Sequence, residues 1–194
     1  MCGGVIFPFR QEYRQVLQQV YSPEEVELFE RTGYVRSLYW QKGDPVLPVI
    51  MDGQEDELNG HNGDERNEHA GVTIMRWGNR DKASPFPQTG WARVDSIYAG
   101  KWDYLKPSPV LILVTYGVEK GKWFKINNGI RGVVVRRGGD MRAYMLTDQA
   151  VDEYLDMTGH ARMPVLVDQT DFGWIGADPL AQFMQGKSQA QQSS

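Results

Sequence analysis

Residues 110–137 read VLILVTYGVEKGKWFKINNGIRGVVVRR, and this stretch decides the fold. Residues 110–117 are the most apolar run of the chain, short and rich in β-branched side chains, which predicts a central strand. The patterns at 122–126 and 131–137 predict two more strands. The Asn-Asn-Gly signal between them predicts a hairpin turn. The stretch therefore indicates an antiparallel β core.

Short strand patterns recur on both sides of this stretch. They lie at residues 4–9, 45–50, 72–78, 142–147 and 162–167. The prolines within 45–50 predict an edge strand or a strand start, because proline cannot donate to a sheet ladder. We therefore predict an α+β fold with a curved, mainly antiparallel, barrel-like β core and peripheral helices.

Residues 22–33 carry the clearest helix signals. Ser22 suits the N-cap, Pro23 the first helical position, and Glu25 completes a capping box. Gly33 marks the C-terminal stop. Two further helices are predicted, at 148–159 with Asp148 near its N-cap and Gly159 at its stop, and at 178–186.

The length of 194 residues suits one domain, which we place at 1–185, followed by a disordered tail at 186–194. A single cysteine excludes an internal disulfide framework and Cys-rich zinc sites. No apolar run approaches about 18 residues, so no membrane span is expected. No secretory signal is recognisable, and the expected location is the cytoplasm.

The net charge of −4 hides an uneven distribution. An acidic surface insertion at about 51–69 carries seven acidic residues and one arginine, so the rest of the chain is mildly basic. His61 and His69 lie in this insertion, whose glycine-rich carboxylates indicate a solvated loop rather than a metal-ligand set. We expect neither a metal nor a cofactor. The basic and aromatic residues of 120–125 suit nucleic acid or an ordinary solvated strand face.

Three separate patches carry the chemistry. They are Met-Cys-Gly at residues 1–3, Thr-Tyr-Gly-Val-Glu-Lys-Gly-Lys-Trp at 115–123, and Gly-His-Ala-Arg-Met-Pro-Val at 159–165. A unique cysteine with a histidine elsewhere is a pattern of nucleophilic catalysis, because folding unites distant residues. The alternatives are an inert cysteine, a solvated glutamate and a helix-capping histidine.

These motifs resemble the SRAP (SOS-response-associated peptidase) family, which processes abasic sites in DNA. The family begins Met-Cys-Gly and carries a His-x-Arg-Met-Pro segment, matched here by residues 1–3 and 160–164. It also has a strand and turn that end in a glutamate, matched by Glu119. Further similar segments are Pro45–Ile50, Arg76–Gly78 and Trp91–Ser96. The resemblance implies an SRAP-like fold over most of the chain.

The resemblance also implies a mechanism. After removal of Met1, by the protein itself or by an aminopeptidase, the α-amine of Cys2 attacks the aldehyde of an abasic site to form an imine. The thiol then closes a thiazolidine ring, a step that gains from proximity. Glu119 would shuttle protons, and His160 would position or protonate the sugar oxygen. The implied partner is single-stranded DNA with abasic sites, bound by a monomer that is nucleoid-associated on damaged DNA.

The implied DNA contacts come from Arg93, Arg162 and Thr147, because arginine suits phosphate by its charge and its fork of donors. Two positions depart from the family pattern. Gly4 stands where the family has a phosphate-facing arginine, and Trp91 where it has an active-site asparagine. Trp91 can stack on an exposed base or be an ordinary core residue, and Asn79 is a substitute amide from a nearby loop.

Two alternative functions stay open, the first because Cys2 can act as a nucleophile and the second because Gly4 and Trp91 depart from the family pattern. One is a cysteine peptidase-like enzyme that acts on its own N-terminus or on peptides. The other is a DNA-binding module of the same fold that has lost its chemistry.

Overall fold

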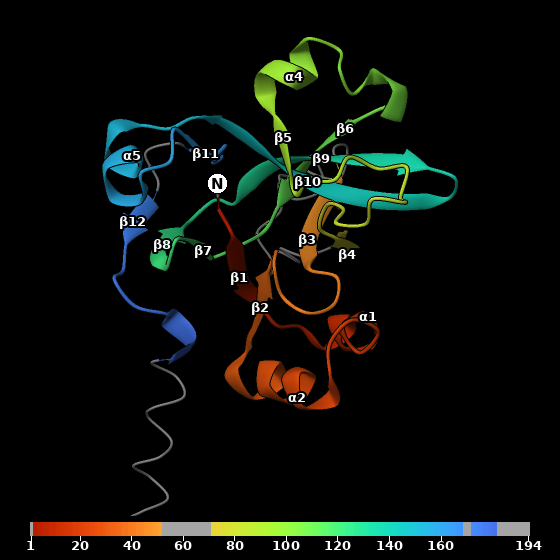
Figure 1. Cartoon of the computed structure of the whole chain (residues 1–194). Coiled ribbons are helices and arrows are strands. Elements are labelled where there is room, and N and C mark those ends of the chain that lie inside the picture. Colours follow the sequence, from red (N-terminus) through yellow and green to blue (C-terminus); the bar gives the residue numbers. More distant parts are fainter. Residues whose placement is uncertain (1, 52–70, 169–171, 182–194) are drawn as a thin grey trace, which may run out of the picture.

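The computed structural model describes residues 2–51, 71–168 and 172–181. The protein is α+β, with two mostly antiparallel sheets and few helices (Figure 1). The predicted α+β class is therefore confirmed. The expected barrel-like closure is wrong, because both sheets are open and end in different edge strands.

The first sheet has five strands in the order β12-β8-β7-β1-β2. These are β12 (Phe172–Trp174), β8 (Lys122–Ile126), β7 (Tyr116–Glu119), β1 (Gly4–Pro8) and β2 (Tyr34–Leu38). The second sheet follows the order β11-β10-β9-β6-β3-β4, with β5 paired in parallel to β10. Its strands are β11 (Arg162–Pro164), β10 (Asp140–Gln149), β9 (Ile130–Arg137), β6 (Ser108–Ile112), β3 (Val46–Met51), β4 (Val72–Arg76) and β5 (Trp91–Arg93).

The described helices are short and lie around the sheets. They are α1 (Arg14–Leu17), α2 (Pro23–Thr32), α4 (Val94–Tyr98), α5 (Asp152–Thr158) and the 3-10 turns Gln11–Tyr13 and Asp103–Leu105. The predicted signals of α2 are confirmed: the Ser22 and Glu25 side chains form the capping box, and Gly33 ends the helix at φ 75°.

The run at 110–117 is two strands rather than one. It begins in β6 of the second sheet and continues in β7 of the first, so the chain crosses between sheets at residues 113–115. Leu113 N–H donates to the Pro48 carbonyl, while Thr115 N–H donates to the Ile6 carbonyl. Apolarity alone does not mark this crossing, because the apolar run continues through it without a break.

The predicted hairpin at Asn-Asn-Gly is also wrong, because β8 and β9 belong to different sheets. The hairpins are instead β7–β8 and β9–β10. Their two-residue loops, Lys120-Gly121 and Gly138-Gly139, all have positive φ, as the turns that match strand twist require. The chain thus crosses between the sheets again at residues 127–129.

The main core lies between the facing sides of the two sheets. It contains Phe7 and Phe124 from the first sheet and Val49, Ile112 and Val134 from the second, all nearly or fully buried. A second cluster covers the outer face of the second sheet, and a third covers the outer face of the first. Burial of both faces of each sheet explains why strand patterns read as continuous apolar runs.

Two further local predictions are corrected. Residues 45–50 are not an edge strand, because β3 lies between β4 and β6. Pro45 directly precedes the first residue of β3, which agrees with the other alternative, a strand start. Proline is tolerated at position 48 because the β3–β6 pairing covers only Val49–Met51. Asp148 is not near a helix N-cap, since it still belongs to β10, and the N-cap of α5 is Val151.

Several predictions lie wholly or partly outside the described residues. They are the acidic insertion, with His61 and His69, the tail at 186–194, and most of the helix at 178–186. Within the described ranges, no helix is both long enough and apolar enough to cross a membrane.

Candidate active site

Cys2 is held in place just before β1. Gly3 N–H donates to the Val118 carbonyl at 2.8 Å, and the Gly3 carbonyl accepts from Tyr39 N–H at 2.9 Å. The Cys2 carbonyl accepts from the Trp91 indole Nε1 at 3.1 Å. The start of β1 is thus bonded to β7, to the end of β2 and to β5, and it lies between α5 and β5 (Figure 1).

The Cys2 thiol is fully buried and donates to the Gly4 carbonyl at 3.0 Å. Burial raises the pKa of this thiol to about 12, and the nearby Glu119 carboxylate acts in the same direction. The thiol is therefore protonated at neutral pH. It needs a proton acceptor when it reacts, because the thiolate is the nucleophilic form.

Glu119 and His160 form a pair beside the cysteine. His160 Nε2 lies 3.0 Å from Glu119 Oε1. Glu119 ends β7, directly before the tight Lys120-Gly121 turn, and only 6 % of its side chain is exposed. His160 follows Gly159, the left-handed cap of α5, and 37 % of its side chain is exposed. A buried carboxylate and a solvent-facing imidazole in contact can pass a proton between site and solvent.

Desolvation lowers the pKa of His160, and the positive charge of Lys120 acts the same way. Glu119 opposes both effects. A Cβ placed on Gly159 would lie 3.6 Å from Lys120 Nζ, so the ammonium group packs over the cap that precedes His160. His160 is therefore mainly neutral at neutral pH, with Lys120 as a neighbouring cation.

Tyr154 of α5 is a site residue that sequence reasoning missed. Its ring is fully buried, and its hydroxyl oxygen has no hydrogen-bond partner among the described residues. Burial raises the pKa of this phenol, and the Glu119 carboxylate, like a Cys2 thiolate, raises it further, so the hydroxyl stays protonated. Nothing in the sequence separates Tyr154 from an ordinary core tyrosine.

Trp91 is 8 % exposed and belongs to the main core, which favours the core alternative over an open stacking surface. Its ring packs against Tyr39 at a centroid distance of 4.5 Å. Asn79 does not serve as the substitute amide: its Nδ2 donates to the carbonyls of Asp81 and Phe86, which fixes its own loop. Trp123 is likewise buried, so the stretch at 120–125 presents lysines but no open ring.

Gly4 has no space for a side chain. A Cβ at this position would lie 2.4 Å from Leu38 Cδ2 and 2.9 Å from Val118 Cγ1. Both distances are shorter than real Cβ contacts, so the arginine of the family pattern would force the side chains of Leu38 and Val118 to move.

Arg93, Thr147 and Arg162 meet on adjacent strands. Thr147 of β10 pairs with Arg93 of β5 and with Pro164 of β11. Arg162 donates to the Thr147 carbonyl at 2.7 Å, whereas Arg93 Nε donates to Asp95 Oδ1 at 3.0 Å. Hydrogen bonding to Arg93 lowers the pKa of Asp95, and Arg162 contributes.

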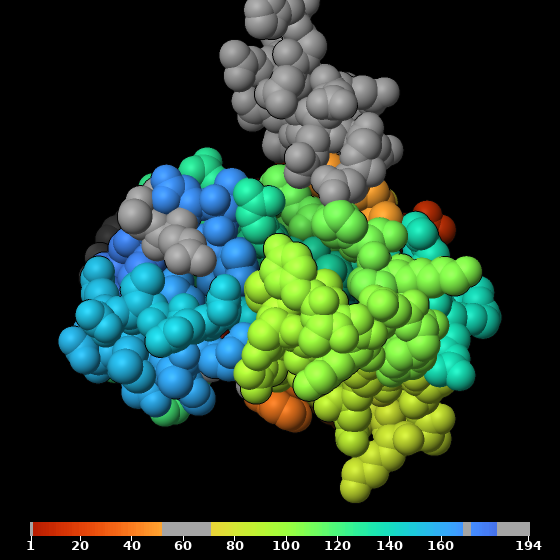
Figure 2. Space-filling model, turned by 90° about the horizontal axis from the view of Figure 1, so that it is seen from above, coloured from red at the N-terminus to blue at the C-terminus, as the bar shows by residue number. Residues whose placement is uncertain are grey.

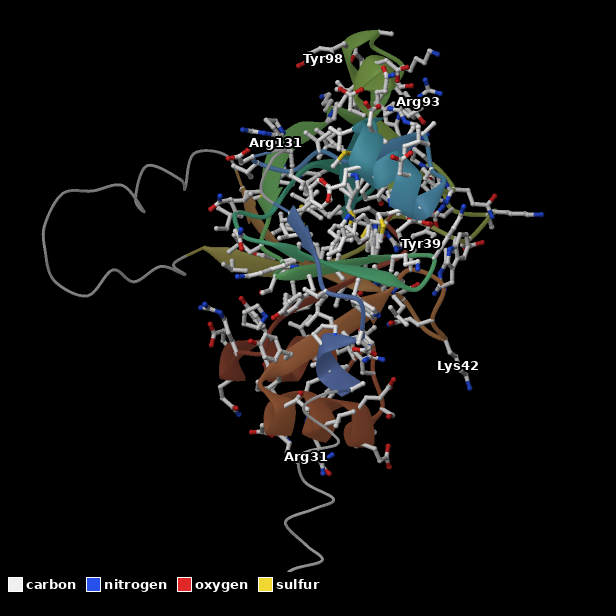
Figure 3. All side chains as sticks on the ribbon, turned by 90° about the vertical axis from the view of Figure 1, so that its left-hand side faces the viewer. Arg31, Tyr39, Lys42, Arg93, Tyr98 and Arg131 are labelled. Atoms are coloured by element: carbon white, nitrogen blue, oxygen red, sulfur yellow. The ribbon has the colours of Figure 1, made fainter. Side chains whose placement is uncertain are left out.

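The two arginines come from two neighbouring parts of one face. Figure 2 shows the segment around α4 directly beside residues 150–168 on this face. Arg93 follows Trp91 by two residues in the sequence, and Arg162 follows His160 by two. Figure 3 places Arg93 at the α4 end of the molecule.

The structure thus brings Cys2, Glu119, His160 and Trp91 together, with the arginine–threonine group alongside. Sequence reasoning missed Tyr154 and the proximity of Lys120 to His160. Among the described residues, no three His, Cys, Asp or Glu side chains are placed to share a metal ion. A cavity of about 510 Å³ opens on the other side of β10, lined by Leu146 and Asp148, and does not include this cluster.

Comparison of the chain with models of protein families gave no match, and a search of curated proteins gave no significant match.

Proposed function

We propose that this protein captures abasic sites in single-stranded DNA covalently through Cys2, as the resemblance to SRAP proteins implies. The observation that carries the proposal is that the Glu119–His160 pair lies beside Cys2. Cys2 comes from the start of the chain, Glu119 from its middle and His160 from its C-terminal part. Acid–base groups beside a thiol and a latent α-amine suit addition to an aldehyde.

The chemistry balances without any oxidant or reductant. Once Met1 is removed, Cys2 carries a free α-amine, and its neutral form is the nucleophile. It adds to the open-chain aldehyde, and loss of one water gives an imine. The thiol then adds across the C=N bond, so that a C–S bond forms and the thiol proton ends on the ring nitrogen. The product is a five-membered thiazolidine.

Glu119 takes the central proton-transfer role in this proposal. It receives the proton of the Cys2 thiol as the C–S bond forms, which matters because burial keeps that thiol protonated. Glu119 also delivers a proton to the departing water. His160, neutral and partly exposed, takes up a proton from solvent and delivers it to the sugar ring oxygen as the ring opens.

Arg93, Arg162 and Thr147 are proposed to contact the DNA backbone. Arg93 is exposed and can exchange its Asp95 partner for a phosphate, whereas Arg162 is held by the Thr147 carbonyl. Trp91 holds the Cys2 carbonyl and thereby orients the amine. We propose in addition that the two-sheet fold is SRAP-like.

A covalent-adduct assay tests this function. Purified protein is mixed with a single-stranded oligonucleotide that carries one abasic site, and products are separated on a denaturing gel. We expect a stable adduct for the unmodified protein. Cys2→Ser keeps the α-amine but lacks the thiol, so its adduct should appear only after borohydride reduction of the imine. No adduct from protein whose intact mass proves loss of Met1 would refute the proposal.

A further inference from the structure

Trp40 is a large aromatic side chain left open to solvent beside the candidate active site. It is 73 % exposed, although the residues on either side of it, Tyr39 and Gln41, are buried or partly buried. A single exposed apolar residue is ordinary on a protein surface. The surroundings of Trp40 are what make it informative.

The turn that carries Trp40 is fixed by hydrogen bonds. Leu38 N–H donates to Gln41 Oε1 at 2.9 Å, and Gln41 N–H donates to the Leu38 carbonyl at 3.1 Å. Arg80 donates to the Gln41 carbonyl at 2.6 Å and also to the Gly43 carbonyl. The backbone beneath the indole is thus held from both sides, and a held aromatic ring loses little conformational entropy on binding.

Packed aromatic side chains connect Trp40 with Cys2. The Trp40 ring lies 4.7 Å from the Tyr39 ring and 6.4 Å from the Trp91 ring, measured between centroids. Trp91 in turn donates to the Cys2 carbonyl at 3.1 Å. The Trp91 ring therefore links the exposed Trp40 ring to Cys2.

The charge beside the ring suits a polyanion. Lys42 is exposed two residues after Trp40, and Figure 3 shows it reaching away from the ribbon into solvent beyond Tyr39. Asp44 of the same turn lies 3.5 Å from Arg76, which offsets its negative charge. A stacking ring with an adjacent lysine is the usual composition of a surface that binds single-stranded nucleic acid.

We infer that Trp40 is the stacking platform for the base that neighbours the abasic nucleotide in single-stranded DNA. This inference rests on the proposed function. An abasic nucleotide has no base of its own, so affinity must come from the flanking bases and the phosphates. Every base presents a π-face, and the platform therefore tolerates different sequences next to the lesion.

The test compares Trp40→Ala and Trp40→Phe with Tyr98→Ala. Tyr98 is a matched control, because it is 87 % exposed but lies on α4, at the far end of the molecule from Lys42 (Figure 3). The first probe is an oligonucleotide whose abasic site has been reduced to an alcohol, which measures binding without chemistry. The second is free 2-deoxyribose, a small aldehyde that measures capture without stacking.

Trp40→Ala should weaken binding of the reduced oligonucleotide by about 5- to 100-fold, the range expected for one lost base–aromatic stack. Trp40→Phe should retain most of the affinity, and Tyr98→Ala all of it. Capture of 2-deoxyribose should be unchanged in all three variants. An unchanged oligonucleotide affinity in Trp40→Ala would overturn the inference, as would loss of self-association in that variant without loss of DNA binding.

The two probes separate this inference from the proposed function. If the unmodified protein captures neither 2-deoxyribose nor the aldehyde form of the oligonucleotide, the proposed chemistry fails. The affinity of the reduced oligonucleotide for the unmodified protein and for Trp40→Ala still shows whether Trp40 is a stacking platform.

Discussion

Replacing Tyr154 with phenylalanine should make the protein more stable. The Tyr154 ring is fully buried, and its hydroxyl lacks a hydrogen-bond partner within the described part of the chain. A buried polar group without a partner costs about 1–3 kcal/mol. Phenylalanine keeps the ring contacts with Phe124 and Trp174, whose centroids lie 5.7 and 5.9 Å away. The free energy of unfolding of Tyr154→Phe should therefore rise by about 1–3 kcal/mol.

Tyr144→Phe is the matched control. Tyr144 is equally buried, but its hydroxyl donates to the Pro87 carbonyl at 3.1 Å. Loss of that bond should lower the free energy of unfolding by about 1 kcal/mol. Denaturant unfolding of the three proteins, with an unchanged m-value, measures both effects. If both variants lose stability equally, a hydrogen bond to the Tyr154 hydroxyl exists and our reasoning about this group is wrong.

The same variant should be slower in adduct formation. The Tyr154 hydroxyl lies within the electrostatic influence of Cys2 and Glu119, where it can hydrogen-bond a bound sugar or a departing water. Enzymes commonly keep a group that serves their activity even though it lowers the stability of the fold. A single-turnover rate on the abasic oligonucleotide measures it. A rate equal to that of the unmodified protein would leave the Tyr154 hydroxyl without a role in the reaction.

Three further outcomes are expected. Gly4→Ala should lower the free energy of unfolding by about 1–3 kcal/mol through overpacking. In the double variant Gly4→Ala/Leu38→Ala, part of the clash should be relieved. If urea unfolding shows that the double variant loses the sum of the two single losses in stability, this explanation is contradicted. Lys120→Ala should raise the pKa of His160, because the Lys120 charge lowers it, and an unchanged pKa in an NMR titration would contradict this. Because the pKa of His160 is lowered in the folded state, the unfolded chain binds more protons below about pH 6.5 and stability falls as the pH drops. His160→Gln should flatten that fall between pH 7.5 and 5, and an identical pH profile for both proteins would disprove the assignment.

Local signals in the sequence were sufficient where one interaction decides the structure. The capping box and the left-handed Gly33 define both ends of α2, because each satisfies backbone groups within a few residues. The strand patterns also gave most strands of the core. Sheet membership could not be read in this way, since the crossings at 113–115 and 127–129 depend on partners far away in the chain.

In the candidate site, too, some residues carry a local sequence motif and others are recognised only in the folded structure. Cys2, Glu119 and His160 were predicted from motifs, and the structure places Glu119 against His160 and within electrostatic reach of Cys2. Tyr154 and Trp40 carry no motif. Their significance comes from burial without a partner in one case and exposure beside the site in the other, and both properties exist only in the folded protein.

The pairing of β1 with β7 has a consequence for the newly made chain. Gly4 pairs with Val118, so the strand that positions Cys2 is synthesised more than a hundred residues after Cys2 itself. At about 5–20 residues per second, that interval is on the order of ten seconds. During it, Cys2 has emerged without Glu119 or His160 beside it. A chain interrupted before β7 therefore contains Cys2 and Trp91 but lacks Glu119 and His160.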